Sequence, residues 1–360
     1  MSGRTPRRTP RLPRRTLATT ALALAAATVP LTVTAHATPP TPKKALKTLD
    51  HRSPISTAFT LPGDRAYPES ITADPRTGDL YISSYVTGTI YRATPGHHTA
   101  QVFLPSGTDG RTTANGVKVD RSGRLWVINS TTGVAVYDLH TRHLIARFDV
   151  ARTGTGAGAG AGAAKPFVND LALTPDGTAY LTDSSRAVIY RVAPHQLAHA
   201  ATHGRHAALP PAYDLSGTLP KDPTAVYTLN GIAAAPSGRY LLTVDMTAGT
   251  LYRVDITSGA IRQVALHGGD IRDGDGLELR GTALWATHNR SNTITRWRLS
   301  DDDATAHLER RLTDPSLQTP TSIVHSRGRP YVTRSQFTKG GPMGQGTPQI
   351  PFTVATVNGI

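Results

Sequence analysis

The sequence repeats one pattern six times. Each copy has a polar residue, an alternating apolar stretch, a turn with glycine, and a second apolar stretch with an aromatic residue near its start. The copies are PESITADPRTGDLYISS from Pro68, ANGVKVDRSGRLWVINS from Ala114, VNDLALTPDGTAYLTDS from Val168, LNGIAAAPSGRYLLTVD from Leu229, GDGLELRGTALWATHN from Gly274 and PTSIVHSRGRPYVTRS from Pro320. Alternation with a period of two, interrupted by Gly, Asp and Pro, is typical of antiparallel strands.

The polar residues that lead the six copies lie 46, 54, 61, 45 and 46 residues apart. They are Glu69, Asn115, Asn169, Asn230, Asp275 and Thr321. A unit of about 45 residues with three or four strands is typical of β-propellers. The two long intervals contain insertions, at 151–166 and at 194–224. The sequence therefore predicts an all-β, six-bladed β-propeller with four-stranded antiparallel blades.

The two ends of the predicted propeller complete one blade. The last copy has predicted strands within 321–335 and at 352–357, but no outer strand of its own. The apolar segment 56–61, at the start of the domain, can supply that strand. Such a closure leaves no open edge in the ring, which removes a site of edge-to-edge aggregation.

The propeller is predicted to occupy residues 55–360, after a leader and a linker. Residues 1–37 have six arginines in the first 15 positions, then an apolar run, and Ala35-His36-Ala37 as a cleavage site. This is typical of a secretory signal peptide, so we expect a secreted, extracellular protein. Arg14-Arg15 fits a twin-arginine signal, and an ordinary Sec signal is the alternative. The Pro- and Lys-rich segment 38–54 is expected to be a disordered linker.

The formal charge of +14 falls to +8 once residues 1–37 are removed. The remaining basic residues are scattered and do not alternate with aromatic residues, so we expect no nucleic-acid partner. After residues 1–37, the sequence has no run of about 18 apolar residues, which is the length needed to span a membrane. The chain has no cysteine, which excludes disulfides, thiolate metal sites and cysteine nucleophiles. A monomer is expected.

Residues that open the first strand of each blade are expected to converge at one mouth of the central channel. Glu69, Asn169, Asn230 and Asp275 would then meet from four blades and offer two carboxylates and two amide oxygens. This set of hard oxygen ligands suits Ca²⁺ or Mg²⁺ better than a metal that favours His and Cys. The alternative is that these side chains only satisfy backbone groups at the turns.

Four of the motifs resemble, in order, those of the regucalcin/gluconolactonase family of six-bladed propellers. They are Glu69, Asn169-Asp170, Asn230-Gly231-Ile232 and Asp275-Gly276-Leu277. The resemblance covers about residues 60–340. It implies that Glu69, Asn230 and Asp275 coordinate a divalent metal and that Asn169 either ligates it or contacts substrate. It also implies that Asp275 is the catalytic general base or nucleophile. Ca²⁺ is expected, with Mg²⁺, Mn²⁺ or Zn²⁺ as alternatives.

The chain departs from this family where substrate is recognised. The sugar-lactone members have an arginine two residues before the asparagine of the third blade, and here that residue is Phe167. The first blade also has Glu69-Ser70-Ile71 instead of Glu-Gly-Pro. A more apolar substrate than a sugar acid is therefore expected. The residues expected to contact it are Asn115, Phe167, Asn169, His288 and Thr321.

Three histidines, His195, His199 and His203, recur at every fourth residue of the second insertion. They would share one face of a helix and could bind a transition metal, but the Gly- and Pro-rich sequence that follows favours an exposed loop. Asp183, Asp245, His288 and Asn289 end the predicted second strands near the same mouth. They could support the site, or serve only the structure. The first insertion enters just before Asn169, either as a flap or as a tolerated loop.

The sequence therefore predicts a secreted, divalent-metal-dependent hydrolase of a small lactone, ester or phosphoester. One alternative is a non-catalytic propeller that binds a ligand and uses its metal for structure. Another is a scaffold for protein contacts, which would require an exposed apolar patch. Because propellers host many unrelated functions, the fold alone does not separate these alternatives.

Overall fold

The structure, a computed structural model, describes residues 54–151, 164–222 and 225–360. These residues belong to one compact unit that spans 52–360. The predicted signal peptide at 1–37 and residues 38–53 of the predicted linker lie outside the described residues. So do residues 152–163 of the first insertion and residues 223–224 of the second.

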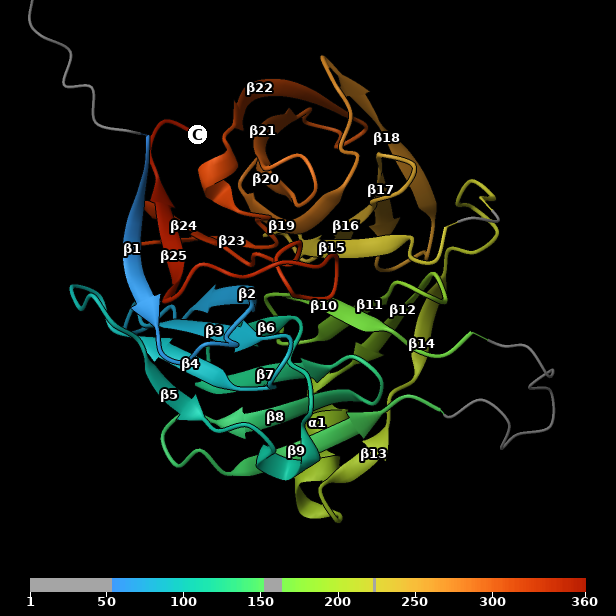
Figure 1. The fold of residues 1–360 in the computed structure, drawn as a ribbon. Helices are drawn as coiled ribbons and strands as arrows, with labels where there is room; N and C mark the ends of the chain where they lie inside the picture. Colours follow the sequence, from blue (N-terminus) through green and yellow to red (C-terminus); the bar gives the residue numbers. More distant parts are fainter. Residues whose placement is uncertain (1–53, 152–163, 223–224) are drawn as a thin grey trace, which may run out of the picture. The chain divides into compact units, whose positions relative to one another are not determined.

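Consecutive antiparallel meanders make up most of the described residues (Figure 1). Meander 1 consists of β2 (Pro68–Ala73), β3 (Leu80–Ser84), β4 (Ile90–Ala93) and β5 (Gln101–Leu104). Meander 2 consists of β6 (Val117–Val119), β7 (Arg124–Asn129), β8 (Gly133–Asp138) and β9 (Leu144–Asp149). Meander 3 consists of β10 (Val168–Leu173), β11 (Ala179–Asp183), β12 (Val188–Val192) and β14 (Pro211–Asp214).

The second half of the chain continues in the same way. Meander 4 consists of β15 (Leu229–Ala234), β16 (Tyr240–Asp245), β17 (Thr250–Asp255) and β18 (Ile261–His267). Meander 5 consists of β19 (Gly274–Arg280), β20 (Ala283–His288), β21 (Thr293–Leu299) and β22 (Thr305–Thr313). Meander 6 consists of β23 (Ile323–Ser326), β24 (Arg329–Thr333), β25 (Phe352–Val357) and, from the start of the domain, β1 (Ile55–Leu61). Short 3-10 turns lie at Thr108–Gly110 and Pro315–Leu317.

The fold is all-β and propeller-like, with four smaller sheets and one sheet of eight strands (Figure 1). The eight-stranded sheet contains meanders 4 and 5, which are joined by parallel pairing of β18 with β22. A further strand, β13 (His206–Ala208), pairs in parallel with β9 and extends the sheet of meander 2 to five strands. The sequence pattern predicted neither parallel pairing, because both join outer strands that lack the repeated motif.

The first strands of the six meanders contact one another in a closed cycle. The order of the cycle is β2, β6, β10, β15, β19 and β23, after which β23 contacts β2. At three steps a side chain accepts a hydrogen bond from a backbone N–H of the neighbouring strand. The acceptors are Ser70 for Val117, Asp170 for Ile232, and Ser322 for Ile71, each at 3.3 Å.

At the other three steps, glycine lets the neighbouring backbone approach closely. Gly116 N–H donates to the carbonyl oxygen of Asn169 at 2.8 Å, and Gly276 N–H donates to that of Thr321 at 2.7 Å. A Cβ atom on Gly231 would overlap the carbonyl oxygen of Asp275. The residue after each leading polar residue is thus one of two kinds. It is either Ser or Asp, whose side chain links two first strands, or glycine, which lets the neighbouring strand pack closely.

The apolar core lies between neighbouring sheets. Trp126 and Phe148 of meander 2 pack in one cluster with Leu171 and Leu181 of meander 3, and each of these side chains is at most 1% exposed. Burying side chains of this size contributes about 1.5–3 kcal/mol each. The alternation read from the sequence explains this arrangement, because each strand has one face against each neighbouring sheet.

The turn between the first and second strands depends on its glycine. Gly177 has φ 85° and Gly238 has φ 71°, in the left-handed region that side chains with a Cβ disfavour. In meander 2 the carboxylate of Asp120 accepts hydrogen bonds from the backbone N–H groups of Ser122 and Arg124 at 2.9 and 3.0 Å. These contacts account for the Asp and Gly positions in the repeated pattern.

The second insertion contains a helix, so our expectation of an exposed loop at its start was wrong. Helix α1 covers Pro194–Thr202, and it begins with proline at its first position. Leu197 and Ala200 are buried in the cluster between meanders 2 and 3, which stabilises the helix despite its short length. Its histidines remain exposed. The rings of His199 and His203 stack with centroids 4.1 Å apart.

Strand β1 pairs with β25 from Ile55–Val357 to Leu61–Phe352, and it is the outermost strand of its sheet. This is the closure expected from the sequence. In the described part of the chain, no helix is long and apolar enough to cross a membrane.

Candidate functional site

The first strands of the meanders begin around one small cavity, which we call the polar cavity. Five of the six leading polar residues line it, and Asn115 lies beside it. Its volume of about 10 Å³ is close to that of one water-sized sphere. The lining residues are Glu69, Ser70, Gly116, Asn169, Asp170, Asn230, Asp275, Gly276, Thr321 and Ser322.

Three carboxylic acids, Glu69, Asp170 and Asp275, are buried together at the polar cavity, each at most 9% exposed. Burial raises the pKa of Glu69 well above its usual range, and the negative charges of Asp275 and Asp170 add to this effect. Burial also raises the pKa of Asp275 to about 8, although a hydrogen bond from Asn289 acts to lower it. None of the three forms an ion pair with lysine or arginine within residues 54–151, 164–222 and 225–360.

Two oxygen atoms at this site lack a hydrogen-bond donor. Oε2 of Glu69 and Oδ1 of Asn289 are buried and have no partner. Leaving a buried carboxylate oxygen unsatisfied is costly, and buried carboxylates are normally paired or coordinate a metal. The site therefore has an excess of buried acceptors and negative charge that a cation would neutralise.

Amide side chains complete the set of oxygen atoms. Nδ2 of Asn169 donates to Oγ of Ser184 at 3.0 Å, and Nδ2 of Asn230 contacts Sδ of Met246 at 3.4 Å. Each amide nitrogen thus has a partner outside the cavity. In the described ranges, no three His, Asp or Glu side chains are arranged to share a metal ion. A metal here would require amide oxygens in addition to Glu69 and Asp275, and such a set of oxygen ligands fits Ca²⁺ or Mg²⁺.

A second ring of residues supports the leading polar residues. Each lies just after the end of a second strand, or two residues after it in meander 6, and 14–16 residues after the leading residue that it contacts. The contacts are Ser130 with Asn115 at 2.5 Å, Ser184 with Asn169 at 3.0 Å, Met246 with Asn230 at 3.4 Å, Asn289 with Asp275 at 2.6 Å, and Ser335 with Thr321 at 2.6 Å. Sequence reasoning singled out only Asn289. The nearly constant spacing of 14–16 residues was the available signal for the others.

The other candidate residues occupy different positions. Thr321 donates to the carbonyl oxygen of Glu69 at 2.5 Å, which links β2 to the segment that leads into β23. His288 is buried, with Nδ1 at 2.7 Å from the carbonyl oxygen of Arg272 and Nε2 at 2.8 Å from Oγ1 of Thr295. Phe167 does not line the cavity, and its ring packs on Tyr227 with centroids 4.7 Å apart.

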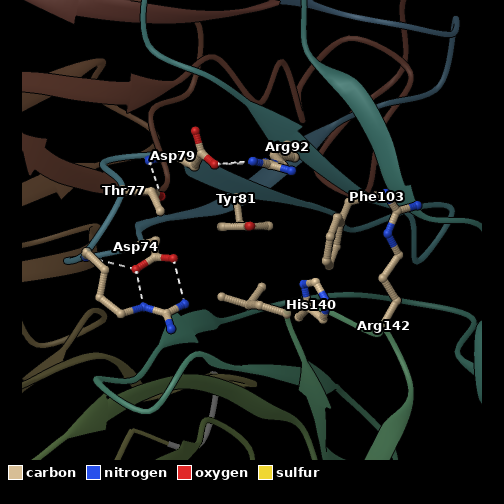
Figure 2. Close-up of a pocket in the computed structure, with 10 residues that line it drawn as sticks. Asp74, Thr77, Asp79, Tyr81, Arg92, Phe103, His140 and Arg142 are labelled. Atoms are coloured by element: carbon tan, nitrogen blue, oxygen red, sulfur yellow. Dashed lines mark hydrogen bonds and ion pairs between the residues drawn. The ribbon is translucent and has the colours of Figure 1, made fainter.

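A larger cavity, of about 400 Å³, lies near the opposite ends of the first strands, between meanders 1 and 2 (Figure 2). Both of its carboxylates are paired with arginine. Asp74 contacts Arg76 at 3.0 Å, and Asp79 forms an ion pair with Arg92. Burial tends to raise the pKa of Asp74, but hydrogen bonds from Arg76 hold it below its usual value. This balance contrasts with the polar cavity, which makes the polar cavity the better candidate for chemistry.

Comparison with protein families identifies the SMP-30/gluconolactonase/LRE-like region over residues 67–324, which includes all the residues of the polar cavity. The chain belongs to this family. The match confirms the resemblance inferred from Glu69, Asn230 and Asp275 and their neighbours. No curated protein matches the chain.

Solved structures share the fold at low sequence identity. A gluconolactonase from Xanthomonas campestris is 16% identical with a TM-score of 0.55, over 84% of this chain and 89% of that chain. A calcium-binding regucalcin from Agrobacterium tumefaciens is 15% identical with a TM-score of 0.53, over 85% and 97%. Virginiamycin B lyase from Staphylococcus aureus is 14% identical with a TM-score of 0.53, over 83% of each chain.

Proposed function

We propose that this chain is a secreted, divalent-metal-dependent hydrolase of a small lactone, ester or phosphoester. The observation that carries the proposal is the unpaired Oε2 atom of Glu69, buried beside Asp275 and Asp170. Membership of the family supports it, and so do neighbours that include a gluconolactonase and a calcium-binding protein.

We also infer that the six meanders are the six blades of a propeller. The closed cycle of six first strands supports this inference, although meanders 4 and 5 share one continuous sheet. In this interpretation the polar cavity lies on the central axis, where each blade supplies one strand.

Glu69, Asn169, Asn230 and Asp275 are the residues that would hold the metal, with Ca²⁺ as the preferred ion because every donor is oxygen. When bound, the cation supplies a Lewis acid that polarises a carbonyl or phosphoryl oxygen. Positive charge in the cavity also lowers the pKa of Asp275, which is otherwise raised to about 8.

The ionised Asp275 is then suited to accept a proton from the attacking water. The water oxygen bonds to the carbonyl carbon or the phosphorus, the bond from that atom to the leaving oxygen breaks, and the leaving oxygen takes up a proton. Asn289 donates to Oδ2 of Asp275 at 2.6 Å and fixes the orientation of the carboxylate.

The proposal is tested by calorimetric titration of residues 54–360 with Ca²⁺. Wild type is expected to bind one equivalent, and Glu69→Gln and Asp275→Asn are each expected to weaken binding at least about tenfold, because each removes a charged ligand. Asp64→Asn, at an exposed position, is the matched control and should bind like wild type. A wild-type protein that binds neither Ca²⁺, Mg²⁺ nor Mn²⁺ would overturn the metallohydrolase proposal.

A second candidate function is a non-catalytic binding module with a structural metal. The small volume of the polar cavity favours it, since about 10 Å³ accommodates an ion but no substrate. A screen of lactones, esters and phosphoesters against the calcium-loaded protein separates the two functions. Turnover that Asp275→Asn abolishes supports the hydrolase. Calcium binding that raises the melting temperature without any turnover supports the module.

We propose secretion on the basis of residues 1–37 of the sequence alone, since they lie outside the described residues. Expression of the full chain and of a variant that begins at residue 38 tests this. The full chain should be found outside the cell and shortened near Ala37, and the variant should stay inside.

A further inference from the structure

Aromatic side chains flank the polar cavity in two pairs. Phe167 and Tyr227 have ring centroids 4.7 Å apart, and Tyr85 and Phe337 have ring centroids 5.5 Å apart. Phe167 directly precedes β10 and Tyr227 closely precedes β15. Tyr85 directly follows β3, whose last residue pairs with Pro68 at the start of β2.

Both pairs lie at the end of the ring where the polar cavity lies. Tyr85 N–H donates to the carbonyl oxygen of Tyr67, which precedes β2, at 3.2 Å. Ser184 N–H donates to the carbonyl oxygen of Phe167 at 2.9 Å, and the hydroxyl of Ser184 accepts from Asn169 in the cavity wall. Each pair is therefore anchored directly beside a leading polar residue.

The order of the cycle places the two pairs across the ring from each other. The Tyr85–Phe337 pair belongs to meanders 1 and 6, and the Phe167–Tyr227 pair belongs to the starts of meanders 3 and 4. In the cycle of first strands, β23 and β2 lie opposite β10 and β15 (Figure 1). The negative charge of Glu69 and the phenol of Tyr227 both act on the Tyr85 hydroxyl, whose pKa burial raises to about 12.

The Phe167–Tyr227 wall is exposed in a way that the core is not. Tyr227 is 42% exposed and the adjacent Val226 is 71% exposed, whereas Phe337 is 5% exposed. Among the described residues, only Val102 and Ile350 are comparable exposed large apolar side chains. An exposed aromatic group beside a buried polar site is typical of a ligand pocket with apolar walls and a few polar groups at its base.

We propose that the polar cavity acts on a substrate with a flat aromatic ring, which lies between the Phe167–Tyr227 and Tyr85–Phe337 pairs. An aryl or aryl-alkyl ester or lactone fits this description, with its carbonyl group at the cavity and its ring between the walls. The inference rests on the proposed hydrolase function. Stacked and edge-to-face contacts with aromatic rings, above all with the exposed ring of Tyr227, favour a planar ring over an alkyl chain of equal length.

Binding of neutral, unreactive amides tests the inference without relying on turnover. We would titrate the protein, with and without Ca²⁺, with 3-phenylpropanamide and with hexanamide. Wild type is expected to bind the aryl amide about tenfold more tightly than the alkyl amide. Tyr227→Leu and Phe167→Leu should each reduce this preference about threefold or more. Tyr213→Leu, which removes a ring from a stacked pair elsewhere, is the control and should leave it unchanged.

The outcomes distinguish the two proposals. An equal affinity for both amides, or a preference that survives both substitutions, would overturn the aryl inference even if calcium binds. An aryl preference in a protein that binds no cation would support the aromatic site and overturn the metallohydrolase. Because Tyr227 lies at the surface and is 42% exposed, its variant should fold normally, and an unchanged melting temperature checks that it does.

Discussion

At the scale of single residues, the polar cavity holds acidic side chains in an environment that disfavours their charge. Asp275 lies in the cavity wall with one oxygen bonded to Asn289, and its pKa is raised to about 8 chiefly by burial. The pKa of Glu69 is raised for the same reason and by its acidic neighbours. A bound cation would offset the cost of burying these charges. Without a cation, ionisation of the buried carboxyl groups lowers the free energy of unfolding.

The stability of the metal-free protein is therefore expected to fall as pH rises. An unfolded aspartate has a pKa of about 4, so the folded state binds this proton more tightly. The contribution of Asp275 is fully present below about pH 4 and is lost as pH rises toward 8. In chelator, we expect the melting temperature to fall by about 5 °C or more between pH 5 and pH 8. Saturating Ca²⁺ should remove most of this fall, and Asp275→Asn should reduce it without calcium. A pH dependence that calcium leaves unchanged would contradict the prediction.

Sequence alone identified the leading polar residues but not all of the residues around them. Glu69 and Asp275 stand out because carboxylates recur in phase with the repeat. Ser184 and Met246 do not stand out. They occupy nearly equivalent positions in their repeats, but one is a hydroxyl and the other a thioether, so the residue type does not recur. Phe167 was expected to contact substrate, but its partner Tyr227 follows an insertion whose conformation the repeat does not determine.

At the scale of strands, close packing of neighbouring first strands depends on particular glycines. Gly231 faces the backbone carbonyl oxygen of Asp275, which is itself a cavity residue on β19. A side chain at position 231 would force β15 and β19 apart. The motif Asn230-Gly231 therefore combines a polar group for the cavity with the space that the next strand requires.

Gly231→Ala is expected to destabilise the protein by about 3 kcal/mol, because overpacking against backbone has no flexible neighbour to absorb it. Gly217→Ala is the matched control, since a Cβ there meets no atom within 4 Å. Denaturant unfolding of both variants measures the difference. A Gly231→Ala protein as stable as the control would show that the two first strands separate easily.

The repeat predicted the strands well because each has one face against each neighbouring sheet. It failed at α1, where buried Leu197 and Ala200 stabilise a helix that the Gly- and Pro-rich sequence after it disfavours. It also failed at β18 and β22, whose parallel pairing joins meanders 4 and 5. Both failures have the same cause, which is that long-range packing overrides local preference.

At the scale of the whole molecule, β1 covers the last unpaired edge of meander 6. Val354, Ala355 and Val357 of β25 are buried in the pairing. A chain that begins at residue 62 should therefore melt at least about 10 °C lower than one that begins at 54, and it should aggregate, because a buried apolar strand becomes an open edge. Thermal unfolding and light scattering compare the two chains. Equal melting temperatures and scattering would show that β1 is dispensable.

The pairing of β1 with β25 also sets an order of events during synthesis. Strand β1 is among the first parts of the domain to leave the ribosome, and its partner is among the last. In a nascent chain, β1 therefore lacks its partner β25 while the intervening meanders form. The ring can close only after translation has almost ended. A stalled or truncated chain cannot be a smaller working version of this protein, because its first strand would lack β25 and keep only the short bridge from Thr60 to Thr99.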